Sequence, residues 1–272
     1  MKVAFQGEPG AFSEEASFAY FDSPETIPCE TFDGVFEAVS SGECERGLIP
    51  IENSLAGSIH QNYDLLLRNE LHIVGEHFLR VRLCLIAFPG AKKADIRHIL
   101  SHPQPLGQSA GYLRGMQGVT TEPVYDTAGS VKLLKASGEH TTAAIASKRA
   151  AKIYGMQILE EGIEDNPENY TRFLAIAREP ILPSGEAKTS IVFTLKNQPG
   201  ALFKALSVFA LREIDLTKIE SRPLAGKPWE YLFYIDFIGK VQDQTVQRAL
   251  DHLGEYALML RVFGSYARAN LV

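Results

Sequence analysis

Neutral hydrogen-bond donors follow an apolar run at Pro50-Ile51-Glu52-Asn53-Ser54. Asn53 and Ser54 stand where a strand is expected to end and a helix to begin. Side-chain donors at the carboxyl end of a strand, beside the N–H groups that open a helix, form the usual anion site of an α/β protein. The plainer interpretation is that one of these residues caps the helix, and residue chemistry alone favours it.

A second polar string, Ser101–Gln108, also follows an apolar run and precedes a helical pattern. Ser101 and Gln108 add a hydroxyl and an amide to the donors that an anionic ligand needs. A G-x-S-x-G pattern overlaps this string at Gly107–Gly111, but a nucleophile elbow requires a strand that runs straight into the turn. Two prolines interrupt that path, and Ser109 falls inside an expected helix. We therefore interpret Ser109 as a packing residue.

The string Asn169-Tyr170-Thr171-Arg172-Phe173 places polar groups directly against an apolar strand pattern. Arg172 at the start of a buried strand needs a partner, because an unpaired buried charge is costly. An anionic ligand would supply that partner through the guanidinium fork. A salt bridge to a nearby carboxylate would serve equally well, and spacing leaves the two interpretations open. The nearby carboxylates are Glu160, Glu161, Glu164 and Asp165.

Metal, nucleotide and nucleic-acid sites are not expected. His98 and His102 are four residues apart, but the segment between them is strand-like, so they would not share a helix face. The sequence contains neither a P-loop nor a G-x-G-x-x-G string. The net charge of −6 argues against a general nucleic-acid or anionic-membrane partner.

Length predicts two domains, and composition predicts a soluble globular protein. The chain has 272 residues, of which 45% are hydrophobic and 22% are charged. The longest apolar run, Leu83–Phe88, is too short for a membrane span, which needs about 20 residues. The N-terminus lacks a signal-peptide pattern. Three widely spaced cysteines indicate reduced thiols, and with them a cytoplasmic protein.

Strand-like and helix-like patterns alternate over the first 180 residues, which predicts an α/β architecture with largely parallel sheets. Strands are expected at 2–6, 47–51, 81–88, 96–100, 143–146, 156–160 and 172–177. Helices are expected at 12–20, 58–67, 107–113, 127–135 and 148–154, the last with Ser147 as its N-cap.

Two prolines and a glycine at Glu179–Ala187 mark a domain boundary. Beyond it the patterns run strand, helix, strand, strand, helix, strand, with a turn expected at 225–228 between the two middle strands. This β-α-β-β-α-β order is that of the ferredoxin-like unit. The loop before its first helix holds Asn197, Gly200, Ala201 and Leu202, and its second strand ends near Glu220 and Ser221. An ordinary turn and strand end explain these residues, but N–H groups at a helix N-terminus also suit a carboxylate.

Taken together, these strings resemble the prephenate dehydratase family over essentially the whole chain. The matching strings are GxxGAFSEEA, PIENS, SHPQPLGQ, YDTAGSV, AAIAS and NYTRF, and NQPGAL with ESRP resembles an ACT regulatory domain. One departure is Ser109, where many relatives carry Cys. The resemblance implies a catalytic domain over 1–180, built of two periplasmic-binding-protein-like lobes with a cleft, and a ferredoxin-like ACT domain over 188–272. It also implies the monofunctional form and a dimer or tetramer.

The resemblance further implies roles for individual residues. Prephenate would lose CO2 and water to give phenylpyruvate, with no metal or cofactor. Thr171 would donate a hydrogen bond to the leaving hydroxyl, Arg172 would hold the pyruvyl carboxylate, and Phe173 would form an apolar wall. Asn53, Ser54, Ser101 and Gln108 would be neutral donors, whereas Glu52 would be protonated or turned away from a dianion.

Phenylalanine is the expected feedback effector, bound in the ACT unit by the residues of Asn197–Leu202 together with Glu220 and Ser221. Two alternatives stay open. An arogenate dehydratase would use the same scaffold on the amino analogue of prephenate. A non-catalytic amino-acid-binding regulator would suit the same domains, although the intact NYTRF string argues against it.

Overall fold

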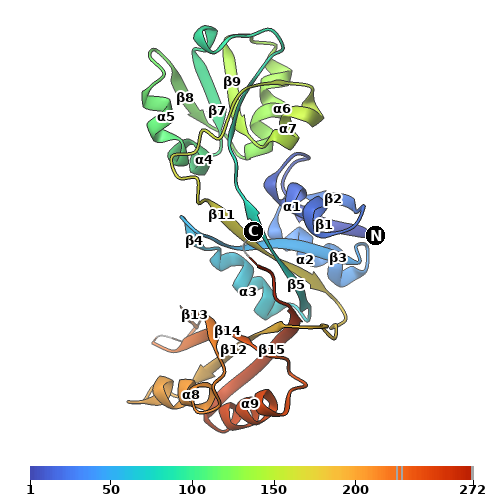
Figure 1. Cartoon of the computed structure of the whole chain (residues 1–272), viewed down its shortest axis with the longest axis vertical. Helices are drawn as coiled ribbons and strands as arrows, with labels where there is room; N and C mark the ends of the chain where they lie inside the picture. Colours follow the sequence, from blue (N-terminus) through green and yellow to red (C-terminus); the bar gives the residue numbers. More distant parts are fainter. Residues whose placement is uncertain (225, 228, 271–272) are drawn as a thin grey trace. The chain divides into compact units, whose positions relative to one another are not determined.

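A computed structural model describes residues 1–224, 226–227 and 229–270, and it divides into two compact units (Figure 1). The first unit holds Met1–Asn69 and His77–Leu174, and the second holds Glu70–Glu76 and the described residues from Ala175 to residue 270. The division falls inside two strands, β5 (His72–Arg80) and β11 (Tyr170–Ala177). The segment 178–186, where we expect the domain boundary, contains neither helix nor strand.

The first sheet has the strand order β2-β1-β3-β11-β5, and the short β4 pairs with β3. Strand β1 lies parallel to both β2 and β3. The elements are β1 (Lys2–Gln6), α1 (Phe12–Tyr20), β2 (Glu25–Cys29), α2 (Phe32–Ser41), β3 (Arg46–Asn53), β4 (Gly57–Ser58), α3 (His60–Arg68), β5 (His72–Arg80) and β11 (Tyr170–Ala177).

The second sheet has the order β10-β6-β9-β7-β8. Its elements are β6 (Cys84–Ala87), η1 (Lys93–Asp95), β7 (His98–Ser101), α4 (Pro103–Gln108), α5 (Ala110–Arg114), β8 (Thr120–Pro123), α6 (Thr127–Ser137), β9 (Thr142–Ala146), α7 (Lys148–Tyr154) and β10 (Gln157–Glu161). Figure 1 shows each sheet with its own helices, so the two α/β lobes are confirmed.

Strand β6, like the short β4 that pairs antiparallel with β3, departs from the expected parallel arrangement. It runs antiparallel to both β9 and β10, whereas β7 is parallel to β8 and β9. Parallel neighbours require a crossover connection such as a helix. Strand β6 instead follows β5 through the short segment 81–83, which contains no helix. It therefore runs in the opposite direction to its neighbours β9 and β10.

Two local expectations are settled at atomic detail. Ser147 caps α7, because its Oγ accepts a hydrogen bond from the Ala150 N–H at 3.0 Å. Ser109 lies at the junction between α4 and α5 rather than inside one helix, and it is fully buried. It is thus no exposed nucleophile.

The β-α-β-β-α-β unit is confirmed as an antiparallel sheet of order β13-β14-β12-β15. Its elements are β12 (Ala187–Leu195), α8 (Ala201–Ala210), β13 (Leu216–Pro223), β14 (Tyr231–Ile238), α9 (Gln244–Tyr256) and β15 (Ala257–Ala267). The turn expected at 225–228 includes two positions, 225 and 228, that lie outside the described residues.

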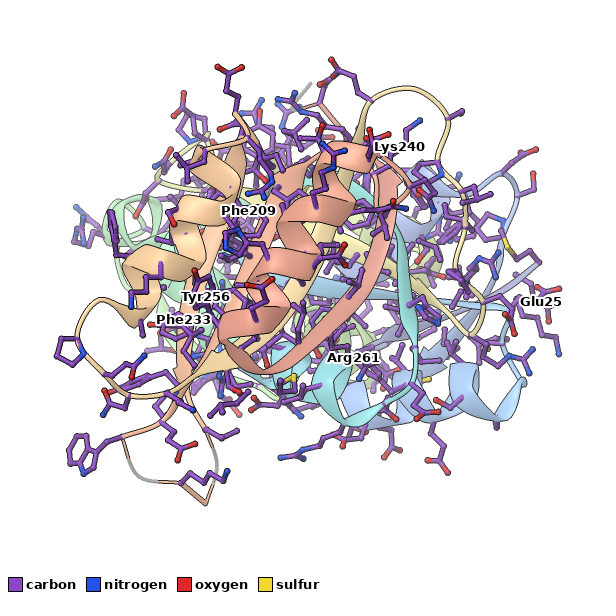
Figure 2. All side chains as sticks on the ribbon, turned by 90° about the horizontal axis from the view of Figure 1, so that it is seen from below. Glu25, Phe209, Phe233, Lys240, Tyr256 and Arg261 are labelled. Atoms are coloured by element: carbon purple, nitrogen blue, oxygen red, sulfur yellow. The ribbon has the colours of Figure 1, made fainter. Side chains whose placement is uncertain are left out.

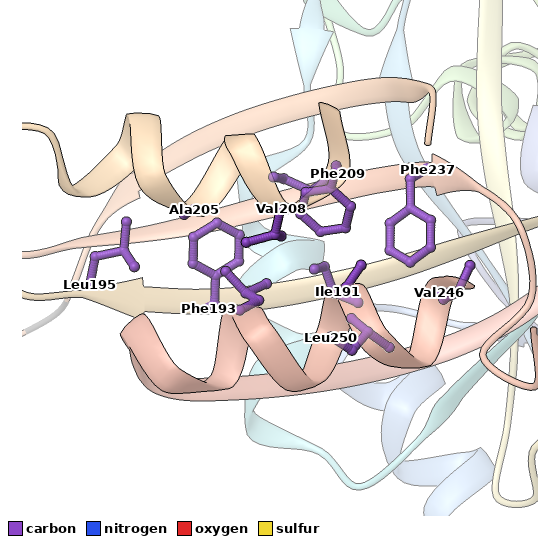
Figure 3. Close-up of a cluster of buried hydrophobic side chains, with 12 residues drawn as sticks. Ile191, Phe193, Leu195, Ala205, Val208, Phe209, Phe237, Val246 and Leu250 are labelled. Carbon is purple, nitrogen blue, oxygen red and sulfur yellow. The ribbon is translucent and has the colours of Figure 1, made fainter. Parts of the chain in front are cut away.

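Aromatic and aliphatic side chains fill the space between this sheet and its two helices. Figure 3 shows Phe193 from β12, Phe209 from α8 and Leu250 from α9 in one buried cluster. Phe233, labelled with Phe209 in Figure 2, stacks on Phe193 with ring centroids 5.6 Å apart. None of the described helices has the length and apolarity that crossing a membrane requires.

Candidate active site

A cavity of about 530 Å³ lies in the first unit, and elements of both α/β lobes line it. The first lobe contributes residues near the ends of its strands and the starts of its helices, and the second contributes mainly α4 and its N-cap. Strand β11 supplies Thr171 and Phe173. The other lining residues are Gln6, Phe12, Ser13, Glu30, Thr31, Phe32, Pro50, Asn53, Ile59, Gln61, Val81, His102, Gln104, Pro105, Gln108 and Thr127.

Thr171 and Asn53 meet at this cavity. The Nδ2 of Asn53 donates to the Thr171 Oγ1 at 3.0 Å. The Thr171 hydroxyl thus acts as acceptor toward Asn53 and keeps its own proton to donate. No acceptor for that proton is found among the residues that the structure describes, and Thr171 lines the cavity. The pair therefore presents a hydroxyl donor to a ligand.

Arg172 does not line the cavity. Successive side chains of a strand point to opposite faces, so Thr171 and Phe173 face the cavity while Arg172 faces away from it. Arg172 is only 6% exposed and is engaged by other groups of the protein. The expectation that Arg172 clamps a carboxylate inside the cavity thus disagrees with its placement.

The four carboxylates considered as its partners have bonds elsewhere. Glu160 pairs with Lys93 at 2.6 Å, and Glu161 pairs with Lys148 at 2.8 Å. Glu164 accepts from the Leu83 N–H, and Asp165 accepts from the Gly111 and Tyr112 N–H groups.

Three other expected donors or acceptors lie outside the cavity lining. The Ser54 hydroxyl donates to the Glu168 carbonyl at 2.8 Å and accepts from the Tyr170 N–H at 3.0 Å, which ties the chain before β11 to the end of β3. The fully buried Ser101 donates to the Ile145 carbonyl at 2.6 Å. Glu52 precedes Asn53 in β3, is half-buried and does not line the cavity.

Lysine and arginine are missing from the cavity lining, all of which lies in the described part of the chain. The charged or chargeable lining residues are Glu30 and His102. The His102 Nδ1 accepts from the Gln104 N–H at 3.3 Å, so a neutral His102 carries its proton on Nε2. Sequence reasoning did not assign either residue, although His102 belongs to the string Ser101–Gln108.

Helix N-termini compensate for the missing cations. Helices α1, α2 and α6 begin with residues that line the cavity, and Ile59 and Gln61 at the start of α3 also line it. The first N–H groups of a helix lack partners within it and carry partial positive charge. Thr31 caps α2 and Asp126 caps α6 with side-chain oxygens. Helix α1 has no side-chain cap after Ala11, so its first N–H groups suit an anion.

A second, smaller cavity of about 120 Å³ lies in the β-α-β-β-α-β unit. Three residues that the sequence assigns to the effector site, Asn197, Ala201 and Leu202, line it together with Trp229, which sequence reasoning missed. The Asn197 Nδ2 donates to the Trp229 carbonyl at 3.5 Å. Glu220 and Ser221 lie on β13 and do not line this cavity within one chain.

Gly200 also lies outside the lining of the second cavity. It is the N-cap of α8 with φ of +78°, a left-handed conformation that favours glycine. No heavy atom lies within 4 Å of the position a Cβ would take. The left-handed backbone conformation by itself therefore explains this glycine.

Comparison with known proteins matches both units. The family model for prephenate dehydratase matches residues 3–181, and the ACT domain model matches residues 189–255. Arogenate dehydratase/prephenate dehydratase 2, chloroplastic, from Arabidopsis thaliana is 51% identical over 98% of this chain and 72% of its own length. Arogenate dehydratase 2 from Petunia hybrida is 49% identical over 98% of this chain and 71% of its own.

Two solved structures are also similar. Prephenate dehydratase from Arthrobacter aurescens in complex with L-Phe has a TM-score of 0.91 and 33% identity, covering 98% of this chain and 90% of that one. GqqA, described as a novel type of quorum quenching acylase, has a TM-score of 0.92 and 35% identity, covering 99% and 98%.

Proposed function

Because the chain belongs to the prephenate dehydratase family, we propose that it catalyses the decarboxylating dehydration of prephenate, or of its amino analogue arogenate. Such an enzyme is a carbon–oxygen lyase. The substrate ring loses CO2 and its C4 hydroxyl and becomes aromatic, which supplies the driving force. The protein must hold the anion, help the hydroxyl leave and avoid stabilising the carboxylate that departs.

The observation that carries the proposal is the contact between Asn53 and Thr171. The Asn53 amide occupies a lone pair of the Thr171 hydroxyl, so the remaining proton is available to the hydroxyl that leaves the substrate. Threonine is too weak an acid to lose its proton outright, so we assign it the role of hydrogen-bond donor. A positioned proton donor of this kind contributes about 10²–10⁴-fold in rate.

Anion recognition is assigned to neutral donors instead of Arg172. The uncapped start of α1 lies at the cavity through Phe12 and Ser13, and Gln108 adds an amide. Neutral N–H groups stabilise a carboxylate less than a cation does. If they contact the ring carboxylate, less stabilisation is therefore lost when that group departs as CO2. Phe173 and other apolar residues of the lining would keep water from the reacting ring.

Arogenate is the second candidate substrate, and Glu30 favours it. Arogenate carries an ammonium where prephenate has a keto group. Glu30 is the acidic residue of the lining, and it stands directly before the N-cap of α2. A carboxylate beside a helix N-terminus offers an acceptor for the ammonium and donors for the carboxylate of an amino-acid head group.

Acyl transfer, the activity in the name of one structural neighbour, has less support. The serine of the G-x-S-x-G string, Ser109, is fully buried and does not line the cavity. An acylase would need an activated nucleophile that its substrate can reach.

We also propose the domain bounds, the effector, the oligomeric state and the cellular location of this enzyme. The catalytic domain would span 1–180 and the ACT domain 188–272, with phenylalanine as inhibitor at the smaller cavity. The relative solved with L-Phe supports this effector. Exposed apolar side chains such as Phe203 and Leu211 support a homo-oligomer, a dimer or tetramer. Free thiols at all three cysteines support a cytoplasmic location.

The test is an assay of the purified, exhaustively chelated and dialysed protein with prephenate and with arogenate in parallel. We expect phenylpyruvate from the first and phenylalanine from the second without added metal. Absence of turnover of both substrates would contradict the proposed function.

A further inference from the structure

Asn169 links the two α/β lobes of the first unit from behind the cavity. Its side chain is fully buried and does not line the cavity. The Asn169 Oδ1 accepts from the Asn53 Nδ2 at 2.8 Å, and the Asn169 Nδ2 donates to the Gln108 Oε1 at 3.0 Å. Asn53 ends β3 of the first lobe, and Gln108 ends α4 of the second.

Resting on the proposed function, we propose that Asn169 is a positioning residue that fixes which way the amide of Gln108 faces. Asn53 fixes the orientation of the Asn169 amide through one hydrogen bond, and Asn169 fixes that of the Gln108 amide through another. As a result, Gln108 presents N–H groups, and not its carbonyl oxygen, to the substrate.

The orientation originates in the backbone. The Asn53 Oδ1 accepts from the N–H groups of Leu55 and Ala56 at 3.1 and 2.9 Å. Backbone N–H groups can only donate, so Asn53 must turn its oxygen toward them and its Nδ2 toward Asn169 and Thr171. An amide offers one acceptor end and one donor end, and this fixes Asn53.

The same logic fixes the next two amides. Asn169 must present its oxygen to the Asn53 Nδ2, which leaves its own Nδ2 facing Gln108. Gln108 must then present Oε1 to Asn169, which leaves its Nε2 as a donor. Gln108 lines the cavity, so the donor end of this amide faces the ligand.

The arrangement aligns two donors on one cavity. Asn53 orients the Thr171 hydroxyl directly and orients Gln108 through Asn169. The Asn169 backbone is also fixed, because its carbonyl accepts from the Val81 N–H at 2.7 Å. These bonds engage both ends of the Asn53 and Asn169 amides and the oxygen of Gln108, so both donors are oriented before substrate arrives.

Asn169→Asp tests the proposal by reversing one hydrogen bond. An ionised aspartate still accepts from Asn53, but it cannot donate to the Gln108 Oε1. Gln108 must then turn its Nε2 toward the new carboxylate and its oxygen toward the cavity. We expect kcat to fall on the order of 10–100-fold at neutral pH with a smaller change in KM.

Acid should restore the activity of this variant. A protonated aspartic acid has a carbonyl that accepts from Asn53 and an O–H that donates to Gln108, so it reproduces both bonds of asparagine. Burial raises the pKa of a carboxyl group, which brings this recovery into a range where the enzyme can be assayed. We expect the ratio of mutant to wild-type kcat to rise as the pH falls.

Asn166→Asp is the matched control. Asn166 is exposed three residues earlier, where its Oδ1 accepts from the Glu168 N–H, so the same substitution adds a charge without touching the three amides. Its ratio to the wild type should not depend on pH. If Asn169→Asp fails to fold, Gln108→Glu replaces it, because an ionised glutamate keeps the bond from Asn169 but cannot donate to substrate. The same kcat loss and acid recovery are then expected.

The outcomes separate two failures. If Asn169→Asp has a normal kcat, or if its pH profile runs parallel to that of the wild type, the role of Asn169 alone is overturned. A wild-type protein that turns over neither prephenate nor arogenate overturns the proposed function and this inference together.

Discussion

The Nδ2 of Asn53 lies 3.0 Å from the Oγ1 of Thr171, although the two residues are 118 positions apart in the chain. The contact arises because β3, which ends at Asn53, neighbours β11, which begins at Tyr170. Neither residue is a strong acid or base. Their chemistry depends on the geometry that the sheet imposes.

Thr171→Ala should lower kcat by about 10²–10⁴-fold with little change in KM, because the bond to the leaving hydroxyl strengthens mainly in the transition state. Thr171→Ser is the matched control, since it keeps the hydroxyl and should retain most of the activity. Steady-state kinetics of both variants provide the measurement. Near-normal turnover by Thr171→Ala would exclude this donor.

Arg172→Met should destabilise the protein and leave KM nearly unchanged. The guanidinium is buried and engaged within the protein, away from the cavity lining. Loss of a hydrogen bond or ion pair made by a buried charged group typically costs about 1.5–3 kcal/mol. Urea unfolding and kinetics on the folded fraction check this. A large rise in KM with unchanged stability would instead restore Arg172 as the anion clamp.

Much of the site could be predicted from sequence, and the errors have a common cause. The strings around Asn53, Gln108 and Thr171 do meet at the cavity. In the string around Thr171, however, neighbouring residues of the strand alternate between faces, so Arg172 points away from it. Glu52, beside Asn53, also lies outside the cavity lining. That alternation is readable in the sequence once a strand is assigned. Which strands become neighbours is not, because a hydrogen bond such as that between Asn53 and Thr171 has no local signal.

The missed elements are those whose residues carry weak patterns. Strand β2 contains a proline, β8 is exposed along its whole length, and helix α2 has Gly34 in its first turn. Strand β5 includes Gly75 and the buried Glu76, whose carboxylate is stabilised by Lys188 at 2.9 Å, 112 positions away. A buried charge looks like a surface residue until its distant partner is known.

Glu14 and Glu15 are neighbours in α1, but their pKa values shift in opposite directions. Substituting them should therefore change the free energy of unfolding at pH 7 with opposite signs. Burial by itself raises the pKa of Glu14, but hydrogen bonds from Arg149, the Gly10 N–H and Thr26 outweigh it, so the net shift is downward. Burial raises the pKa of Glu15, whose Oε2 has no hydrogen-bond partner in the described residues.

A lowered folded-state pKa stabilises the protein above the ordinary value near 4.5, and this contribution is lost as the pH falls through the lowered pKa. Glu14→Gln should therefore cost about 1–3 kcal/mol at pH 7 and progressively less in acid. Glu15→Gln should stabilise at pH 7, because it removes a charge that folding disfavours, and should have no effect in acid. Urea unfolding between pH 3.5 and 7 measures both. Changes of the same sign at pH 7 would contradict the assignment.

Asn197→Ala should weaken inhibition by phenylalanine, because Asn197 lines the smaller cavity and bonds to Trp229. Coupling between an effector and an active site is typically worth about 5–150-fold in affinity. Gly200→Val should act in the same direction, since a β-branched residue is strained at φ of +78°. Ser207→Ala is the control, because Ser207 lies in α8, the helix that Gly200 caps, but does not line the cavity.

Ser221→Ala separates two arrangements of the effector site. Ser221 is exposed on β13 and does not line the cavity within one chain. Weakened inhibition by Ser221→Ala would therefore indicate that β13 of a second copy completes the site. Phenylalanine titrations that are identical for the wild type, Asn197→Ala and Gly200→Val would place the effector elsewhere.

Glu30→Gln should shift substrate preference from arogenate toward prephenate. The ammonium of arogenate loses its charged acceptor, whereas the keto group of prephenate loses a repulsive neighbour. A hydrogen bond to a charged group is worth about 1.5–3 kcal/mol, so the ratio of kcat/KM for the two substrates should change by about 10-fold or more.

Glu37→Gln is the matched control, because Glu37 is exposed on α2 and lies outside the cavity lining. It alters net charge as much as Glu30→Gln does, so it corrects for the long-range repulsion between the protein and a dianion. The ratio should also depend on salt in the wild type, since prephenate carries more net negative charge than arogenate and its repulsion by an exposed carboxylate is screened. Equal changes of kcat/KM for both substrates in Glu30→Gln would show that Glu30 does not select between them.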